Sequence, residues 1–218
     1  MIDDDDRAAA TASRAGAVEA LSAAIRACRI CRDAPRGAVL PHEPRPVAWI
    51  SPTARLLIAG QAPGTKVHAS GRPFDDASGD RLRAWLGVDR ATFYDTNRIA
   101  IVPMGFCFPG QDAKGGDLPP RRECAPAWRA SVMAAMPQVE LVLAIGLYAQ
   151  AWHLGAARGP SLTRTVSDWR AIFDRPVRPR VLPMPHPSWR NTHWLRRNPW
   201  FEAEVLPVLR AEVARLTG

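Results

Sequence analysis

The chain is poor in lysine and in long hydrophobic runs. Lys66 and Lys114 are its only lysines, although lysine and arginine together number 29 against 21 acidic residues. No apolar stretch approaches the ~20 residues that a membrane-spanning helix needs. The acidic start, Met1 to Asp6, has neither the basic nor the apolar segment of a secretory signal. We therefore expect a cytoplasmic protein that does not enter a membrane.

Cysteine is also scarce. The chain has four cysteines: Cys28 and Cys31 form a CxxC pair, and Cys107 and Cys124 follow much later. Because disulfides are rare in the cytosol, thiols at this spacing indicate ligands of zinc or of an iron–sulfur cluster. Unligated thiols remain the alternative at this point.

The charge balance points to a polyanionic partner. The net charge is +8 and the isoelectric point is about 10.3, and almost all of the positive charge is arginine. The planar arginine side chain suits phosphate, so a nucleic acid is the expected partner. A generally arginine-rich composition would be the less specific explanation.

Length and periodicity predict one domain, residues 1–218, in which residues 1–10 are flexible. Short apolar runs alternate with amphipathic segments, which predicts a three-layer α/β/α fold with a central four-stranded, mostly parallel sheet. The expected strands are 55–59, 98–104, 141–146 and 180–184. The expected helices are 7–27, 79–86, 121–136, one from Tyr148, and 200–216 with an interruption at Pro207.

Two of the expected strands end in polar turns rich in glycine or proline. The strand at 55–59 runs into Gly60, Gln61, Ala62, Pro63 and Gly64, and the strand at 180–184 runs into Pro185-His186-Pro187-Ser188. In open α/β sheets, ligands bind at the carboxyl ends of the strands. A flat polar ring therefore fits between these two turns.

These motifs resemble those of the uracil-DNA glycosylase superfamily. The resemblance rests on the order and spacing of GQAPG, Gly71-Arg72-Pro73-Phe74, Asn97 and the HPS turn, and it covers roughly Cys28 to Leu209. It implies a DNA repair enzyme that flips uracil out of DNA and hydrolyses its N-glycosidic bond, leaving an abasic site. The four cysteines resemble those of the iron–sulfur branches, families four and five, which implies a structural [4Fe–4S] cluster on Cys28, Cys31, Cys107 and Cys124.

The resemblance also implies roles for individual residues. Phe74 would stack on the flipped base, Asn97 would read its edge, and His186 with the N–H groups of residues 60–64 would stabilise the leaving base. A core position for Phe74, a turn cap for Asn97 and a structural role for His186 are the alternatives. Ser188, Trp189 and Arg190 follow the histidine and would contact DNA, as aromatic and arginine residues do.

The chain departs from the family at the catalytic acid. Gln61 and Ala62 stand where other branches carry a carboxylate, and neither can act as a base, although Gln61 can orient a water. Asp76 resembles the aspartate of family five and is the second candidate; its alternative role is to cap the following helix. The scarcity of lysine favours a monofunctional glycosylase, since strand-cutting glycosylases commonly form a Schiff base through an amine.

Some alternatives stay open at this point. The same pocket without a base could bind uracil or abasic DNA without cleaving it, and His68 raises the question of covalent trapping through a histidine. A redox role for a cluster is a third possibility. The residues do not fix substrate breadth beyond uracil or the preference for single or double strands. We expect a monomer acting on uracil-containing DNA.

Overall fold

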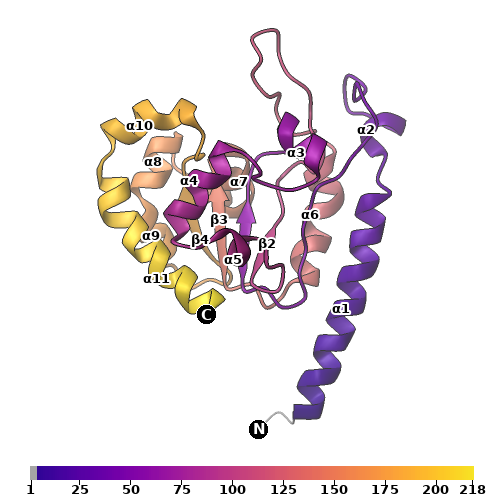
Figure 1. Cartoon of the computed structure of the whole chain (residues 1–218), viewed down its shortest axis with the longest axis horizontal. Helices are drawn as coiled ribbons and strands as arrows, with labels where there is room; N and C mark the ends of the chain where they lie inside the picture. The colour runs from indigo at the N-terminus through magenta and orange to yellow at the C-terminus, as the bar shows by residue number, and fades with distance from the viewer. Residues whose placement is uncertain (1–3) are drawn as a thin grey trace.

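The structure, a computed structural model, describes residues 4–218, with side chains from residue 11 onward. Its centre is a parallel sheet with the strand order β2-β1-β3-β4 (Figure 1). The strands are β1 (Leu56–Ala59), β2 (Ile99–Ile101), β3 (Leu141–Ile145) and β4 (Arg180–Met184). The predicted four-stranded parallel sheet is confirmed, although β2 is shorter than the expected 98–104.

The strands are short and almost wholly buried. Every residue of β1, β2 and β3 is buried, as continuous apolar runs require in a sheet that is covered on both faces. Pro183 interrupts the apolar run of β4, and it is tolerated because β4 is an edge strand, where a missing N–H leaves no partner unpaired. At the other edge, Trp49 pairs with Ile101 through N–O distances of 2.8 and 2.9 Å.

Alternate side chains of the sheet enter two separate cores. Leu56 and Ile58 of β1 point to one core, and Leu57 and Ala59 point to the other. The first core is covered by α4 (Ala77–Leu86), α5 (Arg90–Tyr94), α8 (Leu162–Ser167), α9 (Trp169–Phe173) and α11 (Leu206–Thr217).

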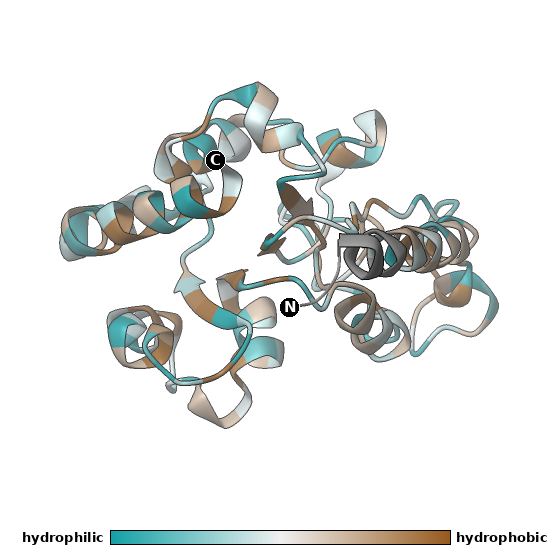
Figure 2. Ribbon diagram, turned by 90° about the horizontal axis from the view of Figure 1, so that it is seen from below, coloured by the Kyte–Doolittle hydropathy of each residue, from teal (hydrophilic) through white to brown (hydrophobic). Residues whose placement is uncertain are grey.

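The opposite core is covered by α1 (Asp4–Arg26), α6 (Cys124–Ala135) and α7 (Gly146–Leu154). The long helix α1 runs alongside α6 at one side of the molecule (Figure 1). Hydrophobic residues gather on the strands and on the helix sides that face them, while the connecting loops are mainly hydrophilic (Figure 2). Helices on both faces of the sheet confirm the three-layer α/β/α prediction.

Several short elements complete the chain, and apart from η3, which falls within the expected helix 200–216, the sequence patterns did not predict them. They are too short to show a helical period, which needs at least two turns to be recognised. They are α2 (Ile30–Asp33), α3 (Thr65–Ser70), the 3-10 helices η1 (Gly155–Ala157) and η2 (Trp189–Asn191), α10 (Thr192–Arg197) and the π-helical η3 (Phe201–Val205).

Two further predictions concern the ends of the chain. Of the predicted flexible segment, residues 1–3 lie outside the described residues, and residues 4–10 form the first turns of α1. The closing helix is divided beside Pro207, as expected: the π-helical η3 ends at Val205, and α11 begins at Leu206 with Pro207 in its first turn, where a missing N–H is tolerated. Within residues 4–218, no helix is both long enough and apolar enough to cross a membrane.

Candidate active site

A cavity of about 510 Å³ lies at the carboxyl ends of the strands. This volume is within the range of small-molecule sites in proteins. It brings together most of the residues predicted for the site from three distant parts of the chain. Its lining includes Gly60, Gln61, Ala62, Pro63, Gly64, Phe74, Asp76, His186, Ser188, Trp189 and Arg190. We call it the active-site cavity.

The turn at residues 60–64 is fixed by the segment that follows β2. The carbonyl of Gly60 accepts from the N–H of Met104, and the carbonyl of Gln61 accepts from the N–H of Gly105, both at 2.9 Å. Gly64 is the N-cap of α3, whose first N–H groups have no carbonyl partner within the helix. Gly64 and Thr65 line the cavity, so the start of α3 lies at its wall.

Phe74 is held in a conformation that few residues adopt. Its φ of 53° lies in the left-handed region, which non-glycine residues occupy rarely and with strain. The hydroxyl of Tyr94 donates to the Phe74 carbonyl at 3.1 Å, and the Phe74 ring meets Phe93 edge-on with centroids 6.2 Å apart. The tip of the ring lies beside Gly60, where an added Cβ would be 3.6 Å away. The surroundings therefore fix an aromatic ring against the 60–64 turn.

His186 is placed as a neutral hydrogen-bond donor. The backbone N–H of Ser188 donates to His186 Nδ1 at 3.2 Å, so this nitrogen carries no proton and the ring proton is on Nε2. Burial lowers the pKa of His186, while the carboxylates of Asp76 and Asp117 act in the opposite direction. The side chain is thus a neutral imidazole that can donate from Nε2 to an atom that gains negative charge.

Asp76 caps α4 and also lines the cavity. Its Oδ1 accepts from the N–H of Gly79 at 3.0 Å, which makes it the N-cap of α4 and explains why this helix begins at Ala77 instead of Gly79. A carboxylate has further lone pairs beyond the one used in capping, so the cap does not prevent contact with a ligand.

Gln61 has a structural contact that its motif did not indicate. Its Nε2 donates to the carbonyl of Leu118 at 3.2 Å. Leu118 is the last residue of a hairpin in which Gln111 and Asp117 form an antiparallel bridge. We call it the 110–118 hairpin. Gln61 therefore joins the 60–64 turn to this hairpin as well as lining the cavity.

Asn97 lies at the wrong end of its strand for the predicted role. It precedes β2, so it is at the amino edge of a parallel sheet whose carboxyl edge forms the cavity. It is exposed, and its side-chain oxygen faces the Thr53 hydroxyl at 3.4 Å. The prediction that Asn97 reads the base is corrected: the cavity residues at the end of β2 and after it are Ile101 and Pro103. Asn97 lies in a turn that Asp95 caps, since the backbone N–H of Asn97 donates to Asp95 Oδ1 at 2.9 Å.

The cavity mouth carries an exposed aromatic and a cation. Trp189 is 74% exposed, and the Arg190 guanidinium lies 5.9 Å from the centre of its ring. Arg81 of α4 donates to the Ser188 carbonyl at 3.0 Å and holds this segment against the body of the protein. The predicted DNA-contacting residues thus lie together at the entrance of the cavity.

The four cysteines lie together outside the cavity. All are free thiols, and Cys31, Cys107 and Cys124 are buried. Burial raises the pKa of Cys107 and of Cys124 to about 12, and the neighbouring cysteines add to both shifts. Their sulfur atoms face N–H donors: Trp128 Nε1 lies 3.3 Å from the Cys28 sulfur, and the Phe106 N–H lies 3.3 Å from the Cys124 sulfur. Over residues 4–218, however, no three Cys, His, Asp or Glu side chains meet at the spacing of a metal-ion site.

His68 lies away from the cavity lining. Its ring contacts His42, with centroids 4.4 Å apart, and Phe108, with centroids 5.7 Å apart. Burial, followed by the charge of His42, lowers its pKa. Although Lys66 and Val67 next to it line the cavity, His68 is not at the surface that a base would meet. Its position gives no support to covalent trapping through this residue.

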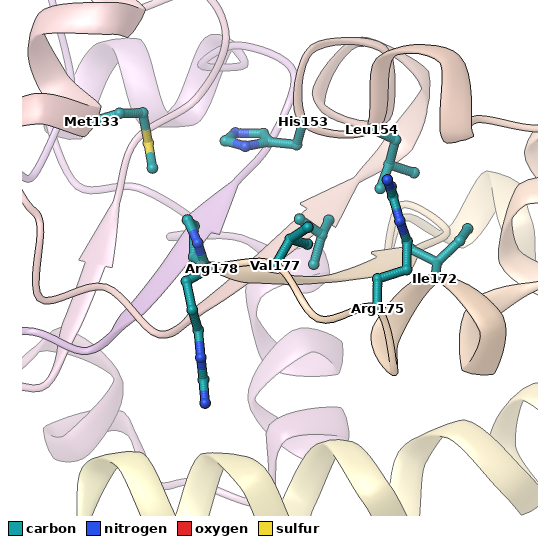
Figure 3. Close-up of a pocket in the computed structure, with 9 residues that line it drawn as sticks. Met133, His153, Leu154, Ile172, Arg175, Val177 and Arg178 are labelled. Atoms are coloured by element: carbon teal, nitrogen blue, oxygen red, sulfur yellow. The ribbon is translucent and has the colours of Figure 1, made fainter.

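A second cavity, of about 330 Å³, lies between α6, α7 and the segment before β4 (Figure 3). The His153 ring points from α7 toward Met133 of α6. His153 Nε2 lies 2.5 Å from a guanidinium nitrogen of Arg129, and burial followed by this positive charge lowers its pKa to about 3. None of the predicted site residues lines this cavity, so we do not assign it a catalytic role.

The sequence motifs did not predict that the 110–118 hairpin contributes to the site. Gln111, Gly115 and Asp117 line the active-site cavity, together with Lys66 and Ser78. A loop rich in glycine and proline has no periodic pattern, so its only signal was the polar Gly115-Gly116-Asp117 stretch.

The profile of the Uracil DNA glycosylase superfamily matches residues 47–210. The chain belongs to the uracil DNA glycosylase superfamily. Membership assigns it to the DNA glycosylases, which hydrolyse the bond between a base and its sugar. The match includes every residue that lines the active-site cavity, and it begins after Cys28 and Cys31.

Proposed function

We propose that this protein excises uracil from DNA as a monofunctional glycosylase, and that it acts as a monomer in the cytoplasm. The observation that carries the proposal is His186, a neutral imidazole with its proton on Nε2, lining the same cavity as the 60–64 turn. When the N-glycosidic bond breaks, its electron pair leaves with the base and places negative charge largely on O2. A neutral imidazole donor in this cavity would stabilise that charge.

The leaving base would be stabilised by His186 together with N–H groups of the 60–64 turn. Donors fixed before the reaction need no reorganisation in the transition state, and removal of one such donor typically slows a reaction by about 10²–10³-fold. Burial keeps the imidazole neutral, so it stabilises the anion by donating a hydrogen bond from Nε2.

The base would stack on Phe74, and its edge would meet mainly backbone groups and Gln61. Ile101 and Pro103, which line the cavity after β2, have apolar side chains and cannot discriminate donors from acceptors. A pocket that relies less on side-chain hydrogen bonds rejects related bases less strictly. We therefore include other deaminated bases among the expected substrates, with uracil as the principal one.

An oligonucleotide with a single uracil tests this function directly. Incubation with the protein, followed by alkali, should give strand cleavage at the uracil, while the same reaction without alkali should leave the strand intact. Lys66 lines the cavity, so sodium borohydride is added in a parallel reaction to trap a Schiff base, and no trapped adduct is expected. Tight binding of uracil or abasic DNA without base release would instead favour a non-catalytic binding protein.

We further propose that Cys28, Cys31, Cys107 and Cys124 hold a structural [4Fe–4S] cluster. Buried thiols with raised pKa values are poorly stable as thiolates unless a positive metal centre compensates them, and N–H groups directed at the sulfurs suit ligated thiolates. Zinc bound by the same four thiolates is the alternative, and metal analysis of the purified protein distinguishes the two.

The cluster would supply structure instead of chemistry at the cavity, because four cysteine ligands leave no open position. It would tie α2 and the start of α6 to the segment after β2. Anaerobically purified protein should be brown and contain about four iron atoms per chain, as a [4Fe–4S] cluster requires. Cys107→Ser should lose iron and colour. Colourless wild-type protein with one zinc per chain would contradict the cluster.

A further inference from the structure

The 110–118 hairpin is a defined structure and not a loose loop. Asp112 N–H donates to the Gly116 carbonyl at 2.8 Å, and Leu118 N–H donates to the Gly110 carbonyl at 2.9 Å. The Asp112 carboxylate accepts from the N–H groups of Lys114 and Gly116, which closes the tip. Figure 1 shows the hairpin projecting beyond α3, at the end of the molecule where the strands end.

The hairpin is attached to both sides of the active-site cavity. On one side, Gln61 of the 60–64 turn donates to the Leu118 carbonyl at 3.2 Å. On the other side, Arg190 donates to the Gly115 carbonyl at 3.4 Å. The hairpin therefore spans the distance between the turn and the segment after His186, and its side chains are placed relative to both.

One of these side chains is a carboxylate over the 60–64 turn. A Cβ added to Gly64 would lie 3.3 Å from Asp117 Oδ2, so this oxygen is next to the backbone of the turn. The Asp117 side chain lines the cavity, and its charge acts on His186 across it. The Nε2 of Gln111 donates to the other oxygen, Oδ1, at 3.2 Å and orients the carboxylate.

Asp117 supplies, beside the 60–64 turn, the carboxylate that the turn itself lacks, since Gln61 is an amide whose Nε2 donates to Leu118. Asp76 and Asp117 each accept one hydrogen bond through Oδ1, from the Gly79 N–H and from Gln111, and Oδ2 of Asp117 is the oxygen beside the turn.

We propose that Asp117 is a catalytic residue, the carboxylate that accepts a proton from the attacking water; this rests on the proposed glycosylase function. The water oxygen forms a bond to C1′ of the sugar as the bond from C1′ to the base nitrogen breaks. The electron pair of that bond leaves with the base, and one proton of the water passes to the Asp117 carboxylate. The site thereby regains an acid through the hairpin where the 60–64 turn lacks one.

The test compares single-turnover excision of uracil by wild type and Asp117→Asn at saturating enzyme. Loss of a general base typically slows a reaction by about 10²–10⁴-fold, and we expect a fall in this range. Binding to DNA with a non-hydrolysable 2′-fluorinated deoxyuridine should change less than about threefold, since the hairpin keeps its shape. Asp174→Asn removes the same charge from an exposed position outside the cavity and should excise at the wild-type rate.

A second variant separates chemistry from structure. Formate added to Asp117→Ala should restore excision at least about tenfold, since a small carboxylate can occupy the vacated space and accept the proton. Wild-type excision together with a fast Asp117→Asn variant would overturn the role of Asp117 alone. A slow variant that formate does not restore, or one that fails only in DNA binding, would also overturn it. An inactive wild type would instead refute the proposed function.

Discussion

Gly79→Ala should displace Phe74, which packs against Gly79, and so impair the active-site cavity. Gly79 lies in the first turn of α4, and an added Cβ would stand 1.8 Å from the carbonyl oxygen of Phe74 and 2.7 Å from its carbonyl carbon. Real Cβ atoms essentially never approach a heavy atom closer than 3.0 Å, so the two backbones must separate by more than 1 Å. The atom in the way is backbone, which cannot swing aside as a flexible side chain can.

The expected loss has two parts. Overpacking a well-filled site typically costs about 1–3 kcal/mol. The shift would also break the hydrogen bond from the Tyr94 hydroxyl to the Phe74 carbonyl, which contributes about 1 kcal/mol. We expect a destabilisation of about 2–4 kcal/mol, which for a chain of this size lowers Tm by about 4–16 °C. Displacement of the Phe74 ring by about 1 Å should slow excision by about 10²-fold.

Thermal unfolding and single-turnover excision measure these two effects separately. Gly16→Ala is the matched control, because Gly16 is also helical but has no heavy atom within 4 Å of an added Cβ. That change should leave excision unaltered and raise stability by up to about 1 kcal/mol, from helix propensity alone. If Gly79→Ala unfolds at the wild-type temperature and excises at the wild-type rate, the close packing of α4 on Phe74 does not position the ring.

Three further changes test other parts of the structure. His186→Ala should slow single-turnover excision by about 10²–10³-fold, and His186→Gln, which keeps a donor, should lose less. Asn97→Ala should excise uracil within about twofold of wild type, because Asn97 lies at the opposite edge of the sheet; a loss of tenfold or more would restore its predicted role. The pKa of His153 is about 3 when folded and about 6.5 when unfolded, so the unfolded chain binds the extra proton between these values. The free energy of unfolding is therefore not reduced by His153 above pH 6.5, and it falls as the pH falls below this value, by about 2 kcal/mol at pH 5. His153→Gln should flatten this part of a plot of Tm against pH.

The sequence predicted the fold well because its strands are continuous apolar runs with clear ends. The apolar runs at 55–59, 141–146 and 180–184 correspond closely to β1, β3 and β4, and their alternation with helices dictates a parallel sheet. Short helices such as α5 were missed, since five residues show no period. In α4 the helix begins two residues earlier than expected because Asp76, and not a residue nearer Gly79, provides the cap.

The site was predicted where a motif lies directly at a strand end. His186 and the 60–64 turn follow β4 and β1 at once, so the topology alone brings them to one edge. The prediction for Asn97 was wrong because this residue comes before its strand instead of after it. The expected strand, 98–104, contains β2, but Asn97 precedes it, and a residue before a parallel strand lies at the edge opposite to a residue after one. The direction of the strand, available from the sequence, already argued against grouping Asn97 with His186.

Asp117 could not be found in this way, because its position depends on contacts that no local pattern encodes. The 110–118 hairpin reaches the cavity only because Gln61 donates to Leu118 and Arg190 donates to Gly115, and each contact joins residues more than 50 positions apart. The apparent lack of an acid in the 60–64 turn is thus a property of the motif and not of the cavity. A carboxylate on a hairpin held at both ends can occupy the place of one carried by the turn, and such an exchange leaves the fold unchanged. For this reason, the two carboxylates that act on His186, Asp76 and Asp117, are more informative about the chemistry of this enzyme than the residues of the turn itself.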